Sequence, residues 1–184
     1  MYRAIYEVKL IELISGSAAQ VVGGYGNDTI ILHGGANISQ YIAGGPGDDT
    51  LTMTGGITIG VEGDAGNDII TVSGGEVTYI AGDEFNGIGQ PIVNALLFGN
   101  DTITVSDVKI NESIYGEGGD DVITLKAGAA IAANVYGDAG TVEPASGAAG
   151  NDLISLEGAT TAGRILTGEG DDVATWTSGT TTFL

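Results

Sequence analysis

GGYGNDTIIL, residues 23–32, is the first complete copy of a unit that is repeated along this chain. The unit is a glycine-rich turn that ends in Asn-Asp or Asp-Asp and leads directly into alternating apolar side chains. Of the 14 aspartates, 13 lie inside such turns, and only Asp107 lies outside them. The copies begin at Gly23, Gly44, Gly63, Gly99, Gly116, Gly150 and Gly168.

The last aspartate of each turn, which we name the closing aspartate, marks the period of the repeat. Four of the six intervals between successive closing aspartates are 19 to 21 residues long, and the other two are 33 and 31 residues. Insertions within the turn, at 84–98 and 139–149, explain both long intervals, so the underlying period is about 20 residues. The closing aspartates are Asp28, Asp49, Asp68, Asp101, Asp121, Asp152 and Asp172.

An alternating pattern follows every closing aspartate. The second and fourth residues after it are apolar in nearly every copy, as with Ile30 and Leu32 in the first. Alternation of period two predicts a half-buried strand, and like residues at one phase predict that the copies stack. A second strand precedes each acidic turn, and neutral turns such as Gly34-Gly35 separate the two strands. This predicts an all-β fold, a flattened parallel β-solenoid of about seven coils.

The repeat also divides the chain into regions. Residues 21–184 are expected to form the solenoid, with the insertions at 84–98 and 139–149. Residues 1–20 are expected to form either a capping segment, helical or extended, or the first coil. The Thr-rich C-terminal tail is compatible with a secretion signal, whereas the N-terminus makes a poor signal peptide.

Composition narrows the classes of partner and of activity. The net charge is −19, with 24 acidic residues against five basic ones. Such a balance disfavours nucleic acid, anionic membranes and acidic polysaccharides as partners, and no apolar run is long enough for membrane insertion. The chain has no cysteine and one histidine, His33, with no triad-like set, so we expect no enzymatic activity.

The acidic turns predict a row of calcium ions along one edge. Stacked carboxylates about 5 Å apart cannot all stay charged and unpaired, so cations are expected between them. Calcium accepts six to eight oxygens, a mixture that closing aspartates and turn carbonyls can supply. We expect about six ions, one between each two consecutive acidic turns. Besides the closing aspartates, the expected ligand residues are Gly24, Gly26, Gly45, Gly47, Asp64, Gly66, Gly119 and Gly170.

GGYGNDTIIL and GGPGDDTLTM resemble the RTX, or hemolysin-type, calcium-binding repeat, G-G-x-G-x-D-x-U-x. The resemblance extends over residues 21–176 and implies a right-handed parallel β-roll that folds with calcium after type I secretion. It also implies that the closing aspartates bind calcium. The chain departs from the family because only alternate turns keep the motif. In this respect it is similar to the coils of about 20 residues in some long bacterial adhesins.

These observations predict a secreted, non-catalytic bacterial protein, extracellular or at the cell surface. Its expected role is a structural subunit of a surface layer, fibre or biofilm that self-associates head to tail or through outer strand faces. The alternatives are an adhesin-type module that binds carbohydrate or ice, or a calcium-folded accessory domain of a secreted protein. The Asn or Asp before each closing aspartate is either turn chemistry or an outward ligand row, and we favour turn chemistry.

Overall fold

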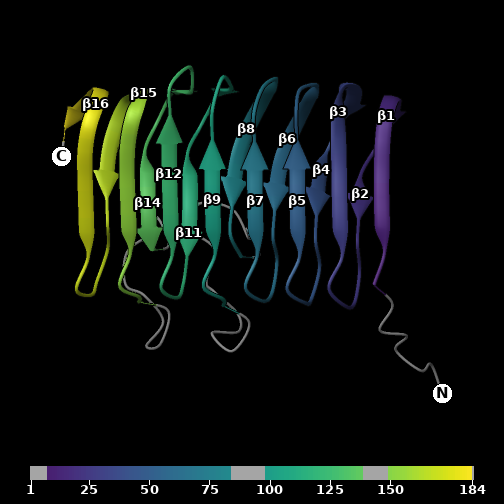
Figure 1. Cartoon of the computed structure of the whole chain (residues 1–184), viewed down its shortest axis with the longest axis horizontal. Helices are drawn as coiled ribbons and strands as arrows, with labels where there is room; N and C mark the ends of the chain where they lie inside the picture. The colour runs from purple at the N-terminus through teal and green to yellow at the C-terminus, as the bar shows by residue number, and fades with distance from the viewer. Residues whose placement is uncertain (1–7, 84–97, 139–148, 184) are drawn as a thin grey trace.

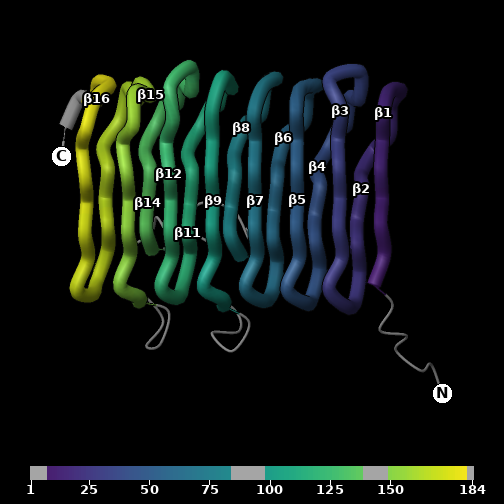
Figure 2. Tube along the Cα trace, viewed as in Figure 1, coloured from purple at the N-terminus to yellow at the C-terminus, as the bar shows by residue number. Residues whose placement is uncertain are grey.

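The chain winds into an elongated β-solenoid of about seven coils (Figures 1 and 2). This computed structural model describes residues 8–83, 98–138 and 149–183. Those residues form strands and no helix, and every strand pair is parallel. The predicted all-β parallel β-solenoid is therefore confirmed. The same residues include no helix that is long and apolar enough to cross a membrane.

One face of the solenoid is made of the first described strand and of the strands that follow the closing aspartates. They pair in register, so that Ile30 lies opposite Leu51 and Leu51 lies opposite Ile70. Each copy of the sequence pattern thus repeats its side-chain directions one layer further along. The strands are β1 (Leu10–Ala18), β3 (Thr29–Ile38), β5 (Thr50–Met53), β7 (Ile69–Val72), β9 (Thr102–Val105), β12 (Val122–Lys126), β15 (Leu153–Leu166) and β16 (Val173–Phe183).

The opposite face is made of the strands that lead into the acidic turns. Here Ile42 lies opposite Val61, and Val61 lies opposite Ile80. The C-terminal end of β15, at Ile165 and Leu166, continues this face beyond its last separate strand. The strands are β2 (Val21–Val22), β4 (Tyr41–Ala43), β6 (Ile57–Glu62), β8 (Glu76–Ala81), β11 (Ile114–Glu117) and β14 (Val135–Asp138).

Two short strands, β10 (Lys109–Ile110) and β13 (Ala130–Ile131), form a third column that the sequence pattern did not separate. β10 pairs with the start of β8 and with β13, and β13 pairs with the middle of β15. Ile110 and Ile131 point into the core and are buried. Each of these short strands follows a neutral turn and carries one inward residue. The chain is therefore extended for a short stretch before it bends into the second long strand.

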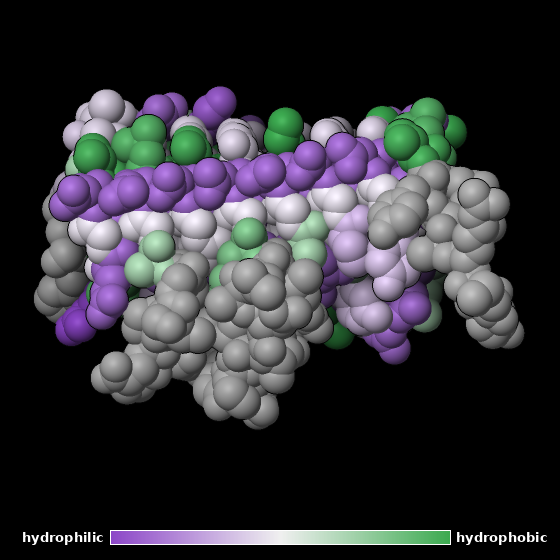
Figure 3. Space-filling model, turned by 90° about the horizontal axis from the view of Figure 1, so that it is seen from below, coloured by the Kyte–Doolittle hydropathy of each residue, from purple (hydrophilic) through white to green (hydrophobic). Residues whose placement is uncertain are grey.

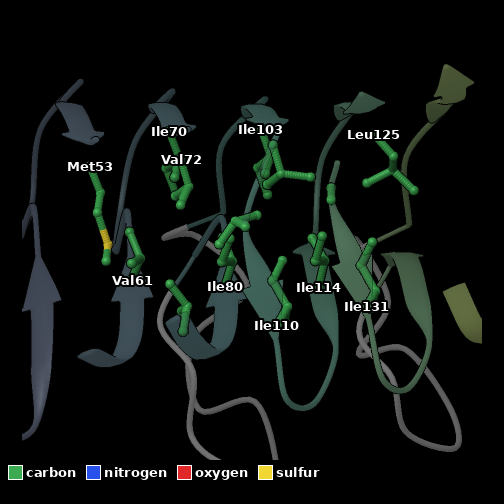
Figure 4. Packing of buried hydrophobic residues seen from close by; sticks show 14 of the residues in the cluster. Met53, Val61, Ile70, Val72, Ile80, Ile103, Ile110, Ile114, Leu125 and Ile131 are labelled. Atoms are coloured by element: carbon green, nitrogen blue, oxygen red, sulfur yellow. The ribbon is translucent and has the colours of Figure 1, made fainter. Parts of the chain in front are cut away.

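The core is a set of apolar columns between the two faces (Figure 4). Ile70 and Ile103 come from one face and meet Ile80 and Ile114 from the other, and all four are fully buried. Aliphatic side chains stacked on their own kind in successive coils bury their surface without any neighbour outside the stack. The predicted inward positions are therefore confirmed through the interior coils.

The first and last described coils differ from the interior because one side of each lies open. β1 pairs with β3 along its length, and Ile11 and Leu13 only partly bury their side chains against the core. At the other end, Trp176 is 49% exposed and Ala174 is exposed as well. Trp176 and Ala174 lie in the predicted inward register, opposite Leu156 and Ile154, but the prediction that they are buried is wrong.

The neutral edge turns the chain with backbone alone. Gly55 and Gly56 both have positive φ, of 151° and 91°, and Gly74 and Gly75 repeat this with 139° and 86°. A Cβ on Gly56 would lie 2.0 Å from the carbonyl oxygen of Ala36 in the preceding coil. These turns need glycine both for their φ angles and for the close stacking of successive coils.

Candidate metal centre along the acidic edge

The closing aspartates form one column along the acidic edge, which is the lower edge of Figure 1. Each precedes a strand whose register is fixed by the apolar columns, so the carboxylates repeat at the same height in every coil. Asp172 is half-buried at the C-terminal end, whereas the other six closing aspartates are at most 2% exposed. Six buried carboxylates in one row need partners of opposite charge or protons.

One oxygen of each closing aspartate is used to hold the stack. The backbone N–H of Asp49 donates to Oδ1 of Asp68 at 2.6 Å, and the N–H of Asp68 donates to Oδ1 of Asp101 at 2.7 Å. The same bond recurs along the column as far as the N–H of Asp152, which donates to Asp172 Oδ1 at 2.9 Å. Every closing aspartate therefore ties its coil to the preceding one.

The second oxygen accepts no hydrogen bond in the six buried closing aspartates. Oδ2 is inaccessible and unbonded in six closing aspartates, namely Asp28, Asp49, Asp68, Asp101, Asp121 and Asp152. Asp28 has the ammonium group of Lys9 3.7 Å from this oxygen. Buried polar atoms are normally satisfied, so a regular column of orphaned oxygens indicates a ligand-binding row.

A backbone carbonyl of the next coil lies beside each orphaned oxygen. The point that a Cβ on Gly23 would occupy is 2.5 Å from Asp28 Oδ2 and 2.4 Å from the carbonyl oxygen of Gly44. At Gly82 the corresponding distances are 2.1 Å to Asp101 Oδ2 and 2.5 Å to the Gly116 carbonyl. The carbonyls that recur in this position belong to Gly44, Gly63, Gly82, Gly116, Gly137 and Thr167.

We name each pair of an orphaned Oδ2 and its neighbouring carbonyl a cradle. The six cradles explain why glycine is needed at positions where the turn geometry does not require it. Gly23, Gly44 and Gly82 have no positive φ, yet any side chain there would collide with a carboxylate oxygen and a carbonyl. The carbonyls of Gly44 and Gly63 also accept one backbone N–H each, from Gly24 at 2.9 Å and Gly45 at 3.2 Å. A carbonyl oxygen has two lone pairs, so each keeps one for a cation.

The turn residues expected from sequence lie in the same edge and shape it. Asp64 has a φ of 71°, and all seven of the expected glycines also have positive φ angles. A Cβ on Gly47 would lie 2.3 Å from the Gly26 carbonyl, which shows how closely successive turns stack. The carbonyls beside the orphaned oxygens come from the neighbouring column that begins at Gly44, which the sequence analysis did not name as ligands. Their signal was a glycine that recurs two residues after the last inward residue of the second strand, with Thr167 in its place in the last copy.

Burial controls the protonation of the row. Desolvation raises the pKa of Asp68 and of Asp121 to about 9, with like charges on neighbouring carboxyls adding to the rise. It raises the pKa of Asp101 and of Asp152 to about 7 and that of Asp49 to about 6. The accepted backbone N–H opposes the rise in each case. Without a cation, Asp68 and Asp121 therefore hold protons at neutral pH.

A second ladder runs along the outside of the acidic turns. The N–H of Asn100 donates to Oδ1 of Asn67 at 2.8 Å, and the N–H of Asp120 donates to Oδ1 of Asn100 at the same distance. These bonds point towards the N-terminus, opposite to those of the closing aspartates. Figure 3 shows the resulting continuous hydrophilic band, formed by Asn27, Asp48, Asn67, Asn100, Asp120, Asn151 and Asp171. These hydrogen bonds within the stack of turns account for the Asn or Asp that precedes each closing aspartate.

Each inserted turn is secured by an aspartate at its start. Asp83 accepts the N–H of Gly99 at 3.1 Å and that of Gly118, in the next coil, at 3.4 Å. Asp138 accepts the N–H of Gly150 at 3.1 Å and that of Glu169, in the next coil, at 2.7 Å. The two turns use the same clasp, which joins both sides of the insertion to the stack. The insertions themselves, 84–97 and 139–148, lie outside the described residues.

The donor set is one of oxygens from carboxylates and carbonyls. Within the described ranges, no three His, Asp or Glu side chains gather into a group that could hold a metal. Each position in the row offers instead one unbonded Oδ2 of a closing aspartate with a carbonyl of the next coil beside it. Hard oxygen ligands of this mixed kind fit calcium and do not fit zinc, which favours His and Cys. Comparison with family models, curated proteins and solved structures finds no match to this chain.

Proposed function

We propose that this protein is a calcium-stabilised structural solenoid, secreted and non-catalytic, in which cations fill the row along the acidic edge. The observation that carries the proposal is the column of six buried Oδ2 atoms that accept no hydrogen bond, each beside a carbonyl of the next coil. Six positions agree with the number expected from seven acidic turns. Calcium bound there would neutralise the row and cross-link every coil to its neighbour.

An extracellular setting suits such a row. Calcium sites of extracellular modules work at roughly 10⁻⁴–10⁻³ M, far above the free calcium of the cytosol. In calcium-poor surroundings folding would have to bury the row either protonated, against the ordinary pKa of aspartate, or charged and self-repelling, and the net charge of −19 has little internal compensation. The chain would then become rigid only after reaching a calcium-rich environment, which is the behaviour implied by its resemblance to RTX repeats.

Self-association is part of the proposal because the solenoid presents apolar surface at defined places. Leu10 and Ile14 of β1 are 69% and 68% exposed. The outward row of the first face adds Ile69, Leu153 and Val173, which are also exposed. Exposed strands with unpaired edges and apolar side chains favour contact with other strands. The proposed material is therefore a surface layer, fibre or matrix built of many copies.

Unfolding measured with chelator, magnesium or calcium tests the metal proposal. We expect little β signal in circular dichroism with chelator at pH 8, and a cooperative gain on adding calcium but not magnesium. At a calcium concentration 100 times the dissociation constant, each site would add about 2.7 kcal/mol to the free energy of unfolding. Equal stability in chelator and in calcium would contradict it. Electron microscopy in calcium tests assembly, and persistent monomers would contradict self-association.

A further inference from the structure

Lys9 occupies the place of a closing aspartate in the first coil. Its backbone N–H donates to Asp28 Oδ1 at 2.7 Å, as the N–H of Asp49 does to Asp68. Its carbonyl accepts the N–H of Thr29 at 2.8 Å, as the carbonyl of Asp28 accepts the N–H of Thr50 at 2.9 Å. Leu10, the next residue, is in register with Thr29. The backbone therefore continues the aspartate column, but the side chain has the opposite charge.

The ammonium group of Lys9 points into the row. Nζ donates to the carbonyl oxygen of Gly23 at 2.6 Å and lies 3.7 Å from Asp28 Oδ2. Gly23 stands in the same position of the turn as Gly44, whose carbonyl lies beside the orphaned carboxylate oxygen of Asp28 in the preceding coil. The two partners of Nζ are thus of the same two kinds as at the later positions, a turn carbonyl and a closing-aspartate Oδ2, although here both come from one turn.

We propose that Lys9 is a built-in cation that fills the first position of the row, where the later positions take calcium. This inference deepens the proposed function and shares its metal row. The ammonium supplies one positive charge to the pair formed by the Gly23 carbonyl and Asp28 Oδ2, so this position needs no metal. The first coil would consequently dock without calcium and present a formed edge to which the next coil adds.

The matched substitutions exchange the charge of Lys9 and leave the rest of the turn unchanged. Lys9→Met removes the ammonium, Lys9→Arg keeps a positive charge, and Lys126→Met removes an exposed lysine of β12 as the control. The readout is amide hydrogen exchange of peptides covering residues 10–35, measured in chelator at a pH where the wild type retains this part of its structure.

We expect Lys9→Met to lose roughly tenfold or more in protection around Gly23 and Thr29, which is the scale of a lost hydrogen bond to a charged group. Lys9→Arg should retain most of the protection, and Lys126→Met should match the wild type. If Lys9→Met unfolds altogether in chelator while Lys9→Arg does not, the charge is again the cause. Equal protection in Lys9→Met and wild type would overturn the inference.

Calcium stoichiometry by native mass spectrometry gives the second test. Lys9→Asp completes the aspartate column, so the number of bound calcium ions should rise by one, from six to seven if all the orphaned oxygens are used. An unchanged number in Lys9→Asp, with the wild type loaded, would contradict the inference. A wild type that binds no calcium would overturn the proposed function, whereas the exchange experiment in chelator would still test Lys9.

Discussion

The acidic and neutral edges of the solenoid reverse the chain equally often but with different chemistry. The neutral edge turns through Gly55 and Gly56 and their equivalents, with positive φ and direct backbone stacking. The acidic edge adds to similar glycines a buried carboxylate in each coil, with one oxygen bonded to the stack and one unbonded. Turning the chain evidently does not require buried acids. Their second oxygen is therefore the feature that calls for a ligand.

The largest expected effect is the dependence of stability on pH in chelator. It arises from the buried carboxyls of the acidic edge, which have no counterpart in the described part of the neutral edge. The folded-state pKa values of Asp68 and Asp121, about 9, lie far above the ordinary aspartate value. The folded protein therefore binds more protons than the unfolded chain, and its stability is greatest below about pH 4 and falls as pH rises towards 9. Denaturant midpoints between pH 4 and pH 7 in chelator measure this, and the β signal should be largely lost by pH 8.

In saturating calcium the trend should reverse. Protons and calcium compete for the same Oδ2 atoms, so calcium binding strengthens as pH rises and the carboxyls lose their protons. The denaturant midpoint in calcium should then rise or stay level between pH 5 and pH 8. A midpoint that falls with pH equally in both conditions would show that cations do not neutralise the row.

The second-largest expected effect is that Asp68→Asn destabilises the protein in calcium but stabilises it in chelator. Asparagine keeps the oxygen that accepts the N–H of Asp49 but replaces the unbonded Oδ2 with an NH₂ group. In calcium the variant should lose about 3 kcal/mol, since an interior carboxylate serves two cation positions. In chelator at pH 8 it should be more stable than the wild type, because it removes a buried charge.

The control for Asp68→Asn is Asp107→Asn on the neutral edge. Asp107 is exposed and lies outside the acidic turns. Its amide variant should change the free energy of unfolding by no more than about 0.5 kcal/mol in either condition. Thermal unfolding of both variants, with and without calcium, gives the comparison. Asp28→Asn should lose less in calcium than Asp68→Asn, because Lys9 already serves one side of Asp28.

A smaller effect is expected from filling one cradle. A Cβ on Gly44 would lie 2.3 Å from Asp49 Oδ2 and 2.6 Å from the Gly63 carbonyl, so Gly44→Ala should cost about 2 kcal/mol and weaken calcium binding. Gly34→Ala, near the neutral edge, places its methyl group in open space and should cost less than about 0.5 kcal/mol. Chemical denaturation with a calcium titration measures both, and equal losses would contradict the cradle.

The smallest effect belongs to the outer ladder. Asn67→Ala removes the acceptor of the Asn100 N–H, at 2.8 Å, from an exposed position. Because water can replace an exposed partner, the loss should be about 0.5–1 kcal/mol, with calcium affinity unchanged. A fall in calcium affinity comparable with that of Asp68→Asn would show that the outer row also binds the metal.

Periodicity predicted the stack because every coil repeats the same inward positions, as Ile70 and Ile103 show. It could not predict the carbonyls beside the carboxylates, since Gly44 reads in the sequence as one more turn glycine while the carbonyl closest to it, that of Gly63, comes from the next coil. Lys9 lies 19 residues before Asp28, at the correct phase, but a search for acids passes over a lysine. Trp176 fits the inward phase and yet is exposed, because phase does not say whether another coil covers it.

In the two inserted turns, the four hydrogen bonds of the aspartate clasps fix the base of the turn and do not involve the side chains of the inserted segment. Asp83 and Asp138 bind the base of the turn on both sides and also the next coil, through backbone N–H groups alone. Such contacts are indifferent to the sequence and length of the segment that leaves between them. Each clasp is therefore a socket on the stack, where one segment can be exchanged for another of different length while the coils on either side keep their register.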